Sequence, residues 1–368
     1  MLSQSPQSQE GEHGETVIGL RSPAVVVADI RFRVVRVFRG HDYSLHRDAL
    51  QVAFVSYACR MRLRKLFFLF AALVVGVPPG VAGDKPARPF ADVDHVVIIS
   101  IDGMRPDRML YANMPTVRAL LAKGAYSFWA RTTAVSVTLP SHVSMLTGVK
   151  PQKHGIAWNT DTLPFEKIVY PAKPSVMEMA HDAGYTTAMA AGKTKFSTLA
   201  KPGTLDYCAL PENDNQTNKF AVAAAEKIIL EHKPGLLFIH FPDVDVRGHK
   251  YGWDSKEQLA AIEQTDRDIQ RVLDALATAG IADHTAIIIS ADHGGAGKTH
   301  GPDDPRSRHI PWIIAGPHVR QGDLTREAEL VINTEDTCAT ACYLLGLPQL
   351  PYFDGRPVLA AFENPPAP

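Results

Sequence analysis

Residues 95–102 read His-Val-Val-Ile-Ile-Ser-Ile-Asp, an apolar run that ends directly on a carboxylate. Further apolar runs follow at residues 186–191, 236–241, 285–290 and 311–315. Most of these runs are continuous, with little alternation of apolar and polar residues. Continuous apolar strands are typical of a parallel sheet that helices cover on both faces. The sequence therefore predicts buried strands at all five positions, the first of them at His95–Ile101.

Amphipathic helices are predicted between the apolar runs. From Ser255 to about Thr278, apolar side chains recur near one helical face, and Gly280 follows the end of the pattern. A second helix is predicted from Asn218 to about His232. Strands and helices that follow one another in turn predict an α/β fold with a doubly wound, mostly parallel sheet and helices on both faces.

One domain is expected over residues 84–368, a length that can bury a full core. The segment 193–219 contains Pro202, Pro211 and a cluster of Asn and Asp residues. This composition differs from that of the predicted strands and helices around it. We expect a small cap insert there.

The composition is that of an ordinary globular protein. Of 368 residues, 45% are hydrophobic and 21% are charged, which excludes a globally disordered chain and a coiled coil. The 38 basic residues nearly balance the 39 acidic ones, so no basic excess points to a nucleic-acid partner. Four cysteines are too few for a disulfide scaffold. Besides Cys208, the chain has Cys338 and Cys342 four residues apart on an apparent helix, and we expect this pair to be packed thiols.

Residues 61–83 have the three parts of a secretory signal peptide. Met61 opens a basic stretch, the apolar residues Leu66–Val77 follow, and small residues precede a cleavage site near Ala82. This apolar run is short for a membrane span, which needs about 20 residues, although a short anchor is the alternative. We expect export, to the periplasm or the exterior, with no stable anchor after cleavage. Residues 1–60 would then be an extension that is either wrongly assigned to the chain or disordered.

Polar side chains stand at the ends of four predicted strands. Asp102 follows the first strand, Lys193 and Lys195 the second, Asp243 and Asp245 the third, and Asp292 and His293 the fourth. In an open α/β sheet, ligands bind beyond the carboxyl ends of the strands. These side chains are expected to converge on one edge of the sheet.

Six residues of this region form a chemically coherent set: Asp102, Asp245, His249, Asp292, His293 and His300. Mixed histidine and aspartate ligation suits zinc, and three residues of each type suffice for two ions. Two metal ions about 3.5–4 Å apart can clamp the attacking and leaving oxygens of a displacement at phosphorus. Taken singly, each histidine is an ordinary surface or core residue, so the prediction of two metal ions depends on the set.

Thr138 is the candidate nucleophile. It opens Thr-Leu-Pro-Ser-His, and Pro140 suits the first turn of a helix that we expect to reach Leu146. Free N–H groups at a helix N-terminus favour a phosphate, and coordination to a metal would activate the hydroxyl group. Without the metal set, Thr138 would be read as an ordinary N-cap.

The motifs resemble those of the alkaline phosphatase superfamily, and among its branches the type I phosphodiesterase/nucleotide pyrophosphatase group. The resemblance covers about residues 93–350 and keeps the family's order. It rests on Ile-Ser-Ile-Asp102-Gly, Thr138-Leu-Pro-Ser-His, His154-Gly-Ile, Asp245-x-x-Gly-His249, Ala-Asp292-His293-Gly and Thr-His300-Gly. It implies an alkaline phosphatase-like catalytic domain over residues 84–368.

The resemblance also implies roles for single residues. One zinc ion would be held by Asp102, Thr138, Asp292 and His293, and the other by Asp245, His249 and His300. Thr138 would attack phosphorus and form a covalent phospho-threonine, which a zinc-activated water then hydrolyses. Asn159 would donate its amide to a non-bridging phosphoryl oxygen.

The sequence departs from the group in two places. The family's nucleophile motif commonly reads Thr-Phe-Pro-Asn-His, and the lost aromatic residue puts a base-stacking pocket in doubt. Lys193 and Lys195, in Ala-Gly-Lys-Thr-Lys-Phe, resemble the paired lysines with which phosphonoacetate hydrolases hold the anionic end of their substrate. The alternative is that both are solvated surface lysines. The sulfatase branch is not favoured, because its nucleophile is a modified Cys or Ser with an Arg shortly after.

The sequence thus predicts an exported two-zinc hydrolase that cleaves phosphodiester or pyrophosphate bonds in small phosphorylated molecules. The first alternative is a phosphonate or phosphomonoester hydrolase that uses Lys193 and Lys195 to bind a second anionic group. A second alternative, from another class, is an inactive binding protein stabilised by metal. It would require a broken ligand set or a missing nucleophile.

Overall fold

A computed structural model of the chain describes residues 85–160, 168–213, 217–301 and 304–368. The predicted extension at 1–60 and the predicted signal peptide at 61–83 lie outside the described residues. Among the helices in the described ranges, none combines the length and the apolar character that a membrane span requires.

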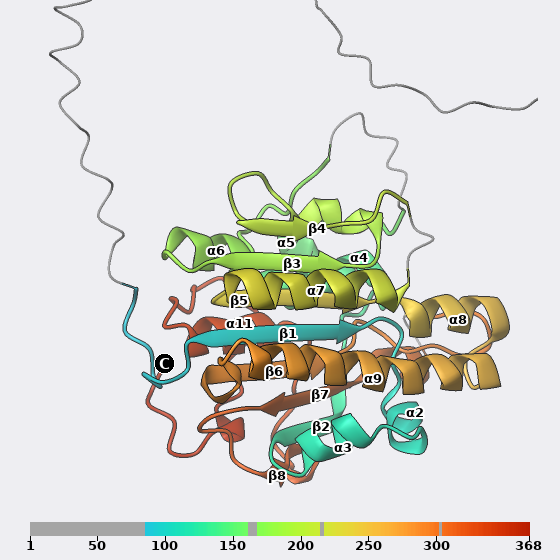
Figure 1. The fold of residues 1–368 in the computed structure, drawn as a ribbon. Coiled ribbons are helices and arrows are strands. Elements are labelled where there is room, and N and C mark those ends of the chain that lie inside the picture. The colour runs from blue at the N-terminus through green and yellow to red at the C-terminus, as the bar shows by residue number, and fades with distance from the viewer. Residues whose placement is uncertain (1–84, 161–167, 214–216, 302–303) are drawn as a thin grey trace, which may run out of the picture. The chain divides into compact units, whose positions relative to one another are not determined.

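One mixed sheet runs through the described part of the chain, with the strand order β4-β3-β5-β1-β6-β7-β2-β8 (Figure 1). The strands are β1 (His95–Ile101), β2 (Ala125–Arg131), β3 (Thr187–Ala191), β4 (Tyr207–Ala209), β5 (Leu236–Phe241), β6 (Thr285–Ser290), β7 (His309–Ala315) and β8 (Gly322–Asp323). All five strands expected from the sequence are present, which confirms the α/β prediction.

The centre of the sheet is parallel and fully buried. Strands β3, β5, β1 and β6 are neighbours in this order, and each pair is parallel. In the middle of the group, Ile99 of β1 pairs with Ile239 of β5 on one side and Ile289 of β6 on the other. All three isoleucines are completely buried. The carboxyl ends of the four strands consequently meet at one edge of the sheet.

The β7 strand runs against this direction. It is antiparallel to both β6 and β2, so the sheet is mixed at this side. The β2 strand was not among the predicted strands, because its sequence Ala-Tyr-Ser-Phe-Trp-Ala-Arg alternates between buried and exposed side chains. Trp129, for instance, is 58% exposed. A strand that keeps one face partly solvated lacks the continuous apolar run that marked the others.

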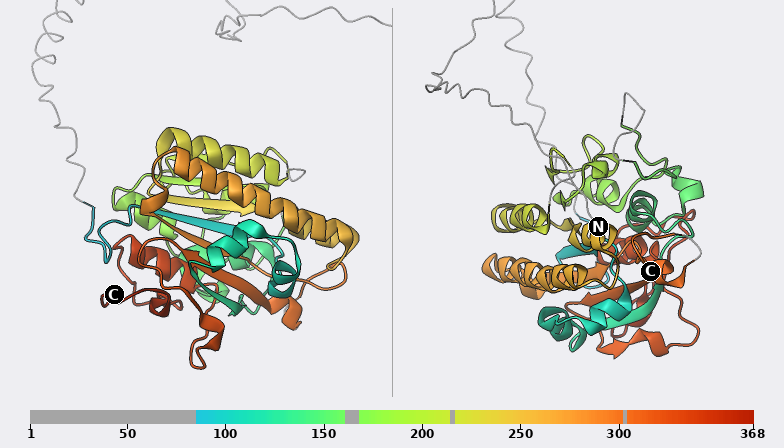
Figure 2. Two further views of the ribbon diagram at one scale, coloured as in Figure 1. Left: turned by 60° about the horizontal axis from the view of Figure 1, so that its bottom comes forward. Right: turned by 90° about the vertical axis from the view of Figure 1, so that its right-hand side faces the viewer.

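Helices cover both faces of the sheet (Figures 1 and 2). The long helices α7 and α9, with α3, pack on one face, whereas α4, α6 and α11 lie on the other. The helices are α2 (Pro106–Tyr111), α3 (Pro115–Leu121), α4 (Thr138–Thr147), α5 (Pro151–His154), α6 (Val176–Asp182), α7 (Asn218–His232), α8 (Asp243–Tyr251), α9 (Lys256–Thr278), α10 (Pro305–Arg308) and α11 (Asp336–Leu344). Short 3₁₀ turns are η1 (Thr194–Leu199), η2 (Ala282–His284), η3 (Leu324–Arg326) and η4 (Leu359–Ala361).

The described part of the segment 193–219 is built into this fold. Its first residues form η1 directly after β3, and β4 then pairs in parallel with the outer side of β3. The segment therefore adds an edge strand to the central sheet before α7 begins. On α11, Cys338 and Cys342 are buried free thiols, as expected, and Cys208 is also free.

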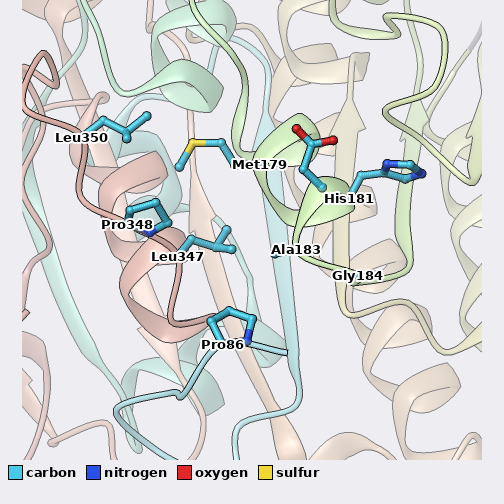
Figure 3. Close-up of a pocket in the computed structure, with 9 residues that line it drawn as sticks. Pro86, Met179, His181, Ala183, Gly184, Leu347, Pro348 and Leu350 are labelled. Atoms are coloured by element: carbon cyan, nitrogen blue, oxygen red, sulfur yellow. The ribbon is translucent and has the colours of Figure 1, made fainter. Parts of the chain in front are cut away.

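A pocket of about 580 Å³ lies between α6 and the turn after α11. Met179, His181 and Gly184 line one side, and Leu347 and Leu350 line the other (Figure 3). Gly184 leads into the amino end of β3. The pocket is thus at the opposite edge of the sheet from the predicted site.

Candidate metal centre

The predicted site residues meet beyond the carboxyl ends of the four parallel strands. Asp102 directly follows β1, and Asp292 and His293 follow β6. Asp245 lies in the first turn of α8, which begins two residues after β5. Lys193 precedes η1, just after β3. Neighbouring parallel strands have their carboxyl ends at the same edge of the sheet, so the residues that follow them lie close together, as expected from the sequence.

Asp245, His249 and His300 form one group of potential metal ligands. One nitrogen or oxygen atom of each lies within 4.8 Å of the others. The α8 helix brings Asp245 and His249 together because they are four residues apart, and His249 Nε2 lies 3.3 Å from Asp245 Oδ1. The Nδ1 atom of each histidine contacts a backbone carbonyl oxygen. His249 Nδ1 lies 3.0 Å from the Lys298 oxygen, and His300 Nδ1 lies 2.7 Å from the Ser136 oxygen. The Nε2 atoms are thereby left to face a cation.

A second group consists of Asp102, Asp245 and His293, all of them buried. His293 Nε2 lies 3.4 Å from Asp102 Oδ1 and 3.2 Å from Asp292 Oδ2. The sequence assigned Asp245 to only one ion, but its carboxylate belongs to both groups. Two cations held here would be close neighbours.

Thr138 is the first residue of α4 and borders the second group. Its Oγ1 lies 3.3 Å from His293 Nε2, and the side chain is 2% exposed. The helix starts at Thr138, after an extended Val137 whose side chain makes no capping hydrogen bond. The partial positive charge of a helix N-terminus therefore lies at the hydroxyl group.

Asn159 is near the same helix start. Its Oδ1 accepts a hydrogen bond from the backbone N–H of Leu139 at 2.9 Å. Lys195 Nζ lies 3.3 Å from the Asn159 backbone oxygen and 3.4 Å from its Oδ1. Because both contacts use oxygen atoms of Asn159, its amide nitrogen is the group that can donate to a ligand.

Lys193 lies deeper, among the carboxylates. Its Nζ is 2.7 Å from Asp102 Oδ2 and 2.7 Å from Asp245 Oδ2. Burial acts to lower the pKa of Lys193, but the two carboxylates outweigh it and raise that pKa. For Asp102, burial raises the pKa, and Lys193 and His240 together bring it well below its ordinary value. The sequence had placed Lys193 at the substrate, not among the predicted ligands.

Two buried histidines that the sequence did not single out contact residues of the site: His240 contacts Asp102, and His142 contacts the backbone of Thr138. His240, on β5, accepts a hydrogen bond at Nδ1 from the Gly192 N–H, so its Nε2 carries the proton and donates to Asp102 Oδ2 at 2.9 Å. His142 contacts the Thr138 carbonyl through Nδ1 at 2.7 Å and Ser100 Oγ through Nε2 at 2.8 Å. A lone histidine inside the apolar run of β5 was the available signal for His240.

The donor set fits divalent cations. Three buried carboxylate oxygens have no hydrogen-bond partner among the described residues: Asp102 Oδ1, Asp245 Oδ1 and Asp292 Oδ2. Burial, with the charges of Asp102 and Asp245, raises the pKa of Asp292 well above its ordinary value. Burial lowers the pKa of His293 to about 4, so its imidazole is neutral at pH 7 and can act as a ligand. Aspartate oxygens and neutral imidazoles together suit zinc.

Comparison with known proteins agrees with this geometry. Residues 96–304 match the type I phosphodiesterase / nucleotide pyrophosphatase family, and this stretch contains every residue of the predicted site. The chain belongs to this family.

The relatives of this phosphodiesterase/pyrophosphatase family member are distant. Ectonucleotide pyrophosphatase/phosphodiesterase family member 7 of Mus musculus is 24% identical over 216 residues, which are 54% of this chain and 49% of that protein. A bis(5'-adenosyl)-triphosphatase of Xenopus laevis is 24% identical over 232 residues, 58% of this chain and 49% of that protein. Venom phosphodiesterase 2 of Crotalus adamanteus is 24% identical over 220 residues, 54% and 26% of the two chains. The matched part is half or less of each relative's length.

Solved structures support the fold. Murine ectonucleotide pyrophosphatase / phosphodiesterase 5 superposes with a TM-score of 0.60 at 15% identity, over 70% of this chain and 96% of that one. A 2-O GAG sulfatase superposes with a TM-score of 0.57 at 14% identity, over 76% and 74% of the two chains. The family member therefore has the alkaline phosphatase-like α/β fold that the motifs predicted.

Proposed function

We propose that the protein is a two-zinc hydrolase that cleaves phosphodiester or pyrophosphate bonds, with Thr138 as the nucleophile. One observation carries the proposal. The Thr138 hydroxyl lies 3.3 Å from His293 Nε2 at the start of α4, beside two adjoining groups of potential zinc ligands. The family match and the names of the relatives support the same class of reaction.

The zinc ligands are proposed to be Asp102, Asp292, His293 and Thr138 for one ion, and Asp245, His249 and His300 for the other. The shared position of Asp245 supports two closely spaced ions. Bound zinc would lower the pKa of the threonine hydroxyl and stabilise negative charge at phosphorus.

The chain's own groups would then act on the substrate. Thr138 Oγ1 forms a bond to phosphorus as the bond to the leaving oxygen breaks, which leaves a covalent phosphoryl-threonine for water to hydrolyse. The Asn159 amide donates a hydrogen bond to a non-bridging oxygen, since its carbonyl oxygen is already engaged by Leu139. The N–H groups of the first turn of α4 add partial positive charge at the same place.

The two lysines support a second candidate, a phosphomonoester or phosphonate hydrolase. Lys195 lies beside Asn159, where the ammonium group could pair with a second negative charge of a substrate. Lys193 is only 11% exposed and is engaged by Asp102 and Asp245, so it would have to leave these carboxylates to reach a substrate. Of the two, Lys195 is the better placed for substrate binding.

We also propose that the enzyme acts outside the cytoplasm on small phosphorylated molecules. The predicted signal peptide at residues 61–83 supports export. One relative is a venom phosphodiesterase, a name that agrees with this location.

The test compares two substrates on the zinc-loaded full chain, bis-p-nitrophenyl phosphate and p-nitrophenyl phosphate, with the Thr138→Ala variant as the blank. A kcat/KM at least about 100-fold higher for the diester, equivalent to about 3 kcal/mol, supports the phosphodiesterase. A preference for the monoester that Lys195→Met abolishes favours the second candidate instead. Hydrolysis of neither substrate above the blank would contradict both.

A further inference from the structure

An aromatic residue that belongs to none of the motifs predicted from the sequence packs beside the candidate metal ligands. Trp253 lies in the short turn between α8 and α9 and is 5% exposed. Its indole approaches three of the four segments that carry predicted zinc ligands, those after β1, in α8 and after β6. On this basis we propose that Trp253 is a positioning residue for the zinc ion at Asp245, His249 and His300, an inference that rests on the proposed function.

The first contact is with the segment after β1. The indole Nε1 of Trp253 donates a hydrogen bond to the backbone oxygen of Gly103 at 2.9 Å. Gly103 follows Asp102 directly and has a positive φ of 75°, so it forms the turn that carries the Asp102 carboxylate. The hydrogen bond ties this turn to the α8–α9 connection.

The second contact is with α8 itself. A Cβ atom added to Gly248 would lie 2.8 Å from three atoms of the indole, so only glycine allows the ring to pack here. Gly248 precedes His249, whose imidazole meets the Trp253 ring edge-on with a centroid distance of 5.2 Å. The indole thereby limits the rotation of the His249 side chain.

The third contact is with the segment after β6. A Cβ atom on Gly295 would overlap the same indole, and the Trp253 backbone N–H donates to Gly297 O at 2.7 Å. The ring of His300 lies 6.1 Å from that of Trp253, at a steep interplanar angle of 70°. The indole is therefore packed against both imidazoles of one predicted zinc site.

Contacts of this kind matter for metal affinity. Groups behind the ligands fix ligand orientation, and their loss typically weakens metal binding by about 10- to 100-fold. Trp253 has ring contacts with His249 and His300, the two imidazoles of one site, but none is seen with His293 of the other. A change at Trp253 should accordingly weaken one zinc ion more than the other.

The experiment is a zinc titration of the full chain against a chromophoric chelator, which reports stoichiometry and the Kd of each ion. We expect the wild-type chain to bind two ions. Trp253→Leu should bind the ion at Asp245, His249 and His300 about 10- to 100-fold more weakly and lose less affinity for the other ion. Trp253→Phe, which keeps a ring but loses the indole N–H, should show the same loss to a smaller extent.

Trp312→Phe is the matched control. Trp312 is also a buried tryptophan whose indole N–H is hydrogen-bonded, but its partner is Thr337 Oγ1. This variant should lose stability and keep both zinc affinities. If Trp253→Leu fails to fold, Gly295→Ala displaces the indole without removing it and should weaken the same ion.

The outcomes separate this inference from the proposed function. Two wild-type zinc affinities in all Trp253 and Gly295 variants would overturn the positioning role and leave the two-zinc enzyme intact. Equal weakening of both ions would overturn the assignment to one site. A wild-type chain that binds no zinc would overturn the metal centre, and the role of Trp253 with it.

Discussion

The Nζ atom of Lys193 lies 2.7 Å from Oδ2 of Asp102, and both side chains are almost completely buried. The same ammonium group lies 2.7 Å from Asp245 Oδ2, so it stands between the carboxylates of two predicted metal ligands. In the chain without metal, Lys193 thus offsets part of the repulsion among Asp102, Asp245 and Asp292.

Replacement of Lys193 by methionine should destabilise the metal-free protein. Removing one partner of a buried ion pair typically costs about 3–5 kcal/mol, because the remaining charge is left uncompensated. Zinc supplies positive charge to the same carboxylates, so the loss should be smaller in the zinc-loaded protein. Urea unfolding of both variants with zinc and with a chelator measures the difference, and Lys195→Met, whose lysine contacts Asn159 instead, is the control. An equal loss with and without zinc would contradict the prediction.

Removal of zinc should lower the thermal midpoint of the wild-type chain. A ligand at 100 times its Kd stabilises a folded protein by about 2.7 kcal/mol, which corresponds to about 4–5 °C for a domain of this size. The physical source is the set of three buried carboxylate oxygens that find no hydrogen-bond partner in the described part of the chain. Thermal scans with zinc, with chelator and after zinc is restored test this. An unchanged midpoint in chelator would argue against a built-in metal centre.

Stability should also respond to the titration of Asp336, on α11 and apart from the metal centre. Burial raises its pKa from 3.8 to about 6, although the N–H groups of Asn333 and Arg356 donate to its carboxylate. Between pH 4 and 6 the unfolded chain loses this proton and the folded chain keeps it. The free energy of unfolding should therefore fall by about 3 kcal/mol as the pH rises through this window.

The comparison for Asp336 is with Asp336→Asn, which cannot titrate. Urea unfolding from pH 4 to pH 7 should show a steeper fall for the wild type than for the variant, since all other carboxyl groups are common to both. Parallel curves for the two proteins would show that the pKa of Asp336 is not raised.

The central sheet could be predicted because its strands are buried on both faces. The runs at His95–Ile101 and Leu236–Phe241 match β1 and β5 in full. Strand direction could not be predicted, because the apolar run of β7 looks the same whether the strand is parallel or antiparallel. The β2 strand was missed since it alternates, and its pairing with β7 shows only in the fold.

Part of the site could be predicted for a similar reason. Asp102, Asp245 and Asp292 follow parallel strands within about four residues, so topology alone brings them to one edge. The ion pairs of Lys193 and the packing of Trp253 depend on rotamers and on contacts between segments about 40 to 150 residues apart, which local patterns do not encode. His240 was hidden because a single histidine in a buried strand usually has a structural role.

The most direct test of the account is the effect of Thr138 on zinc-dependent hydrolysis of bis-p-nitrophenyl phosphate by the full chain. Thr138→Ala should bind two zinc ions and lower kcat/KM by at least about 1,000-fold, equivalent to about 4 kcal/mol. Thr138→Ser, which keeps a hydroxyl group, should retain most of the zinc-dependent activity that Thr138→Ala loses. Zinc-dependent hydrolysis by Thr138→Ala at the wild-type rate would contradict the assignment of Thr138 as the nucleophile.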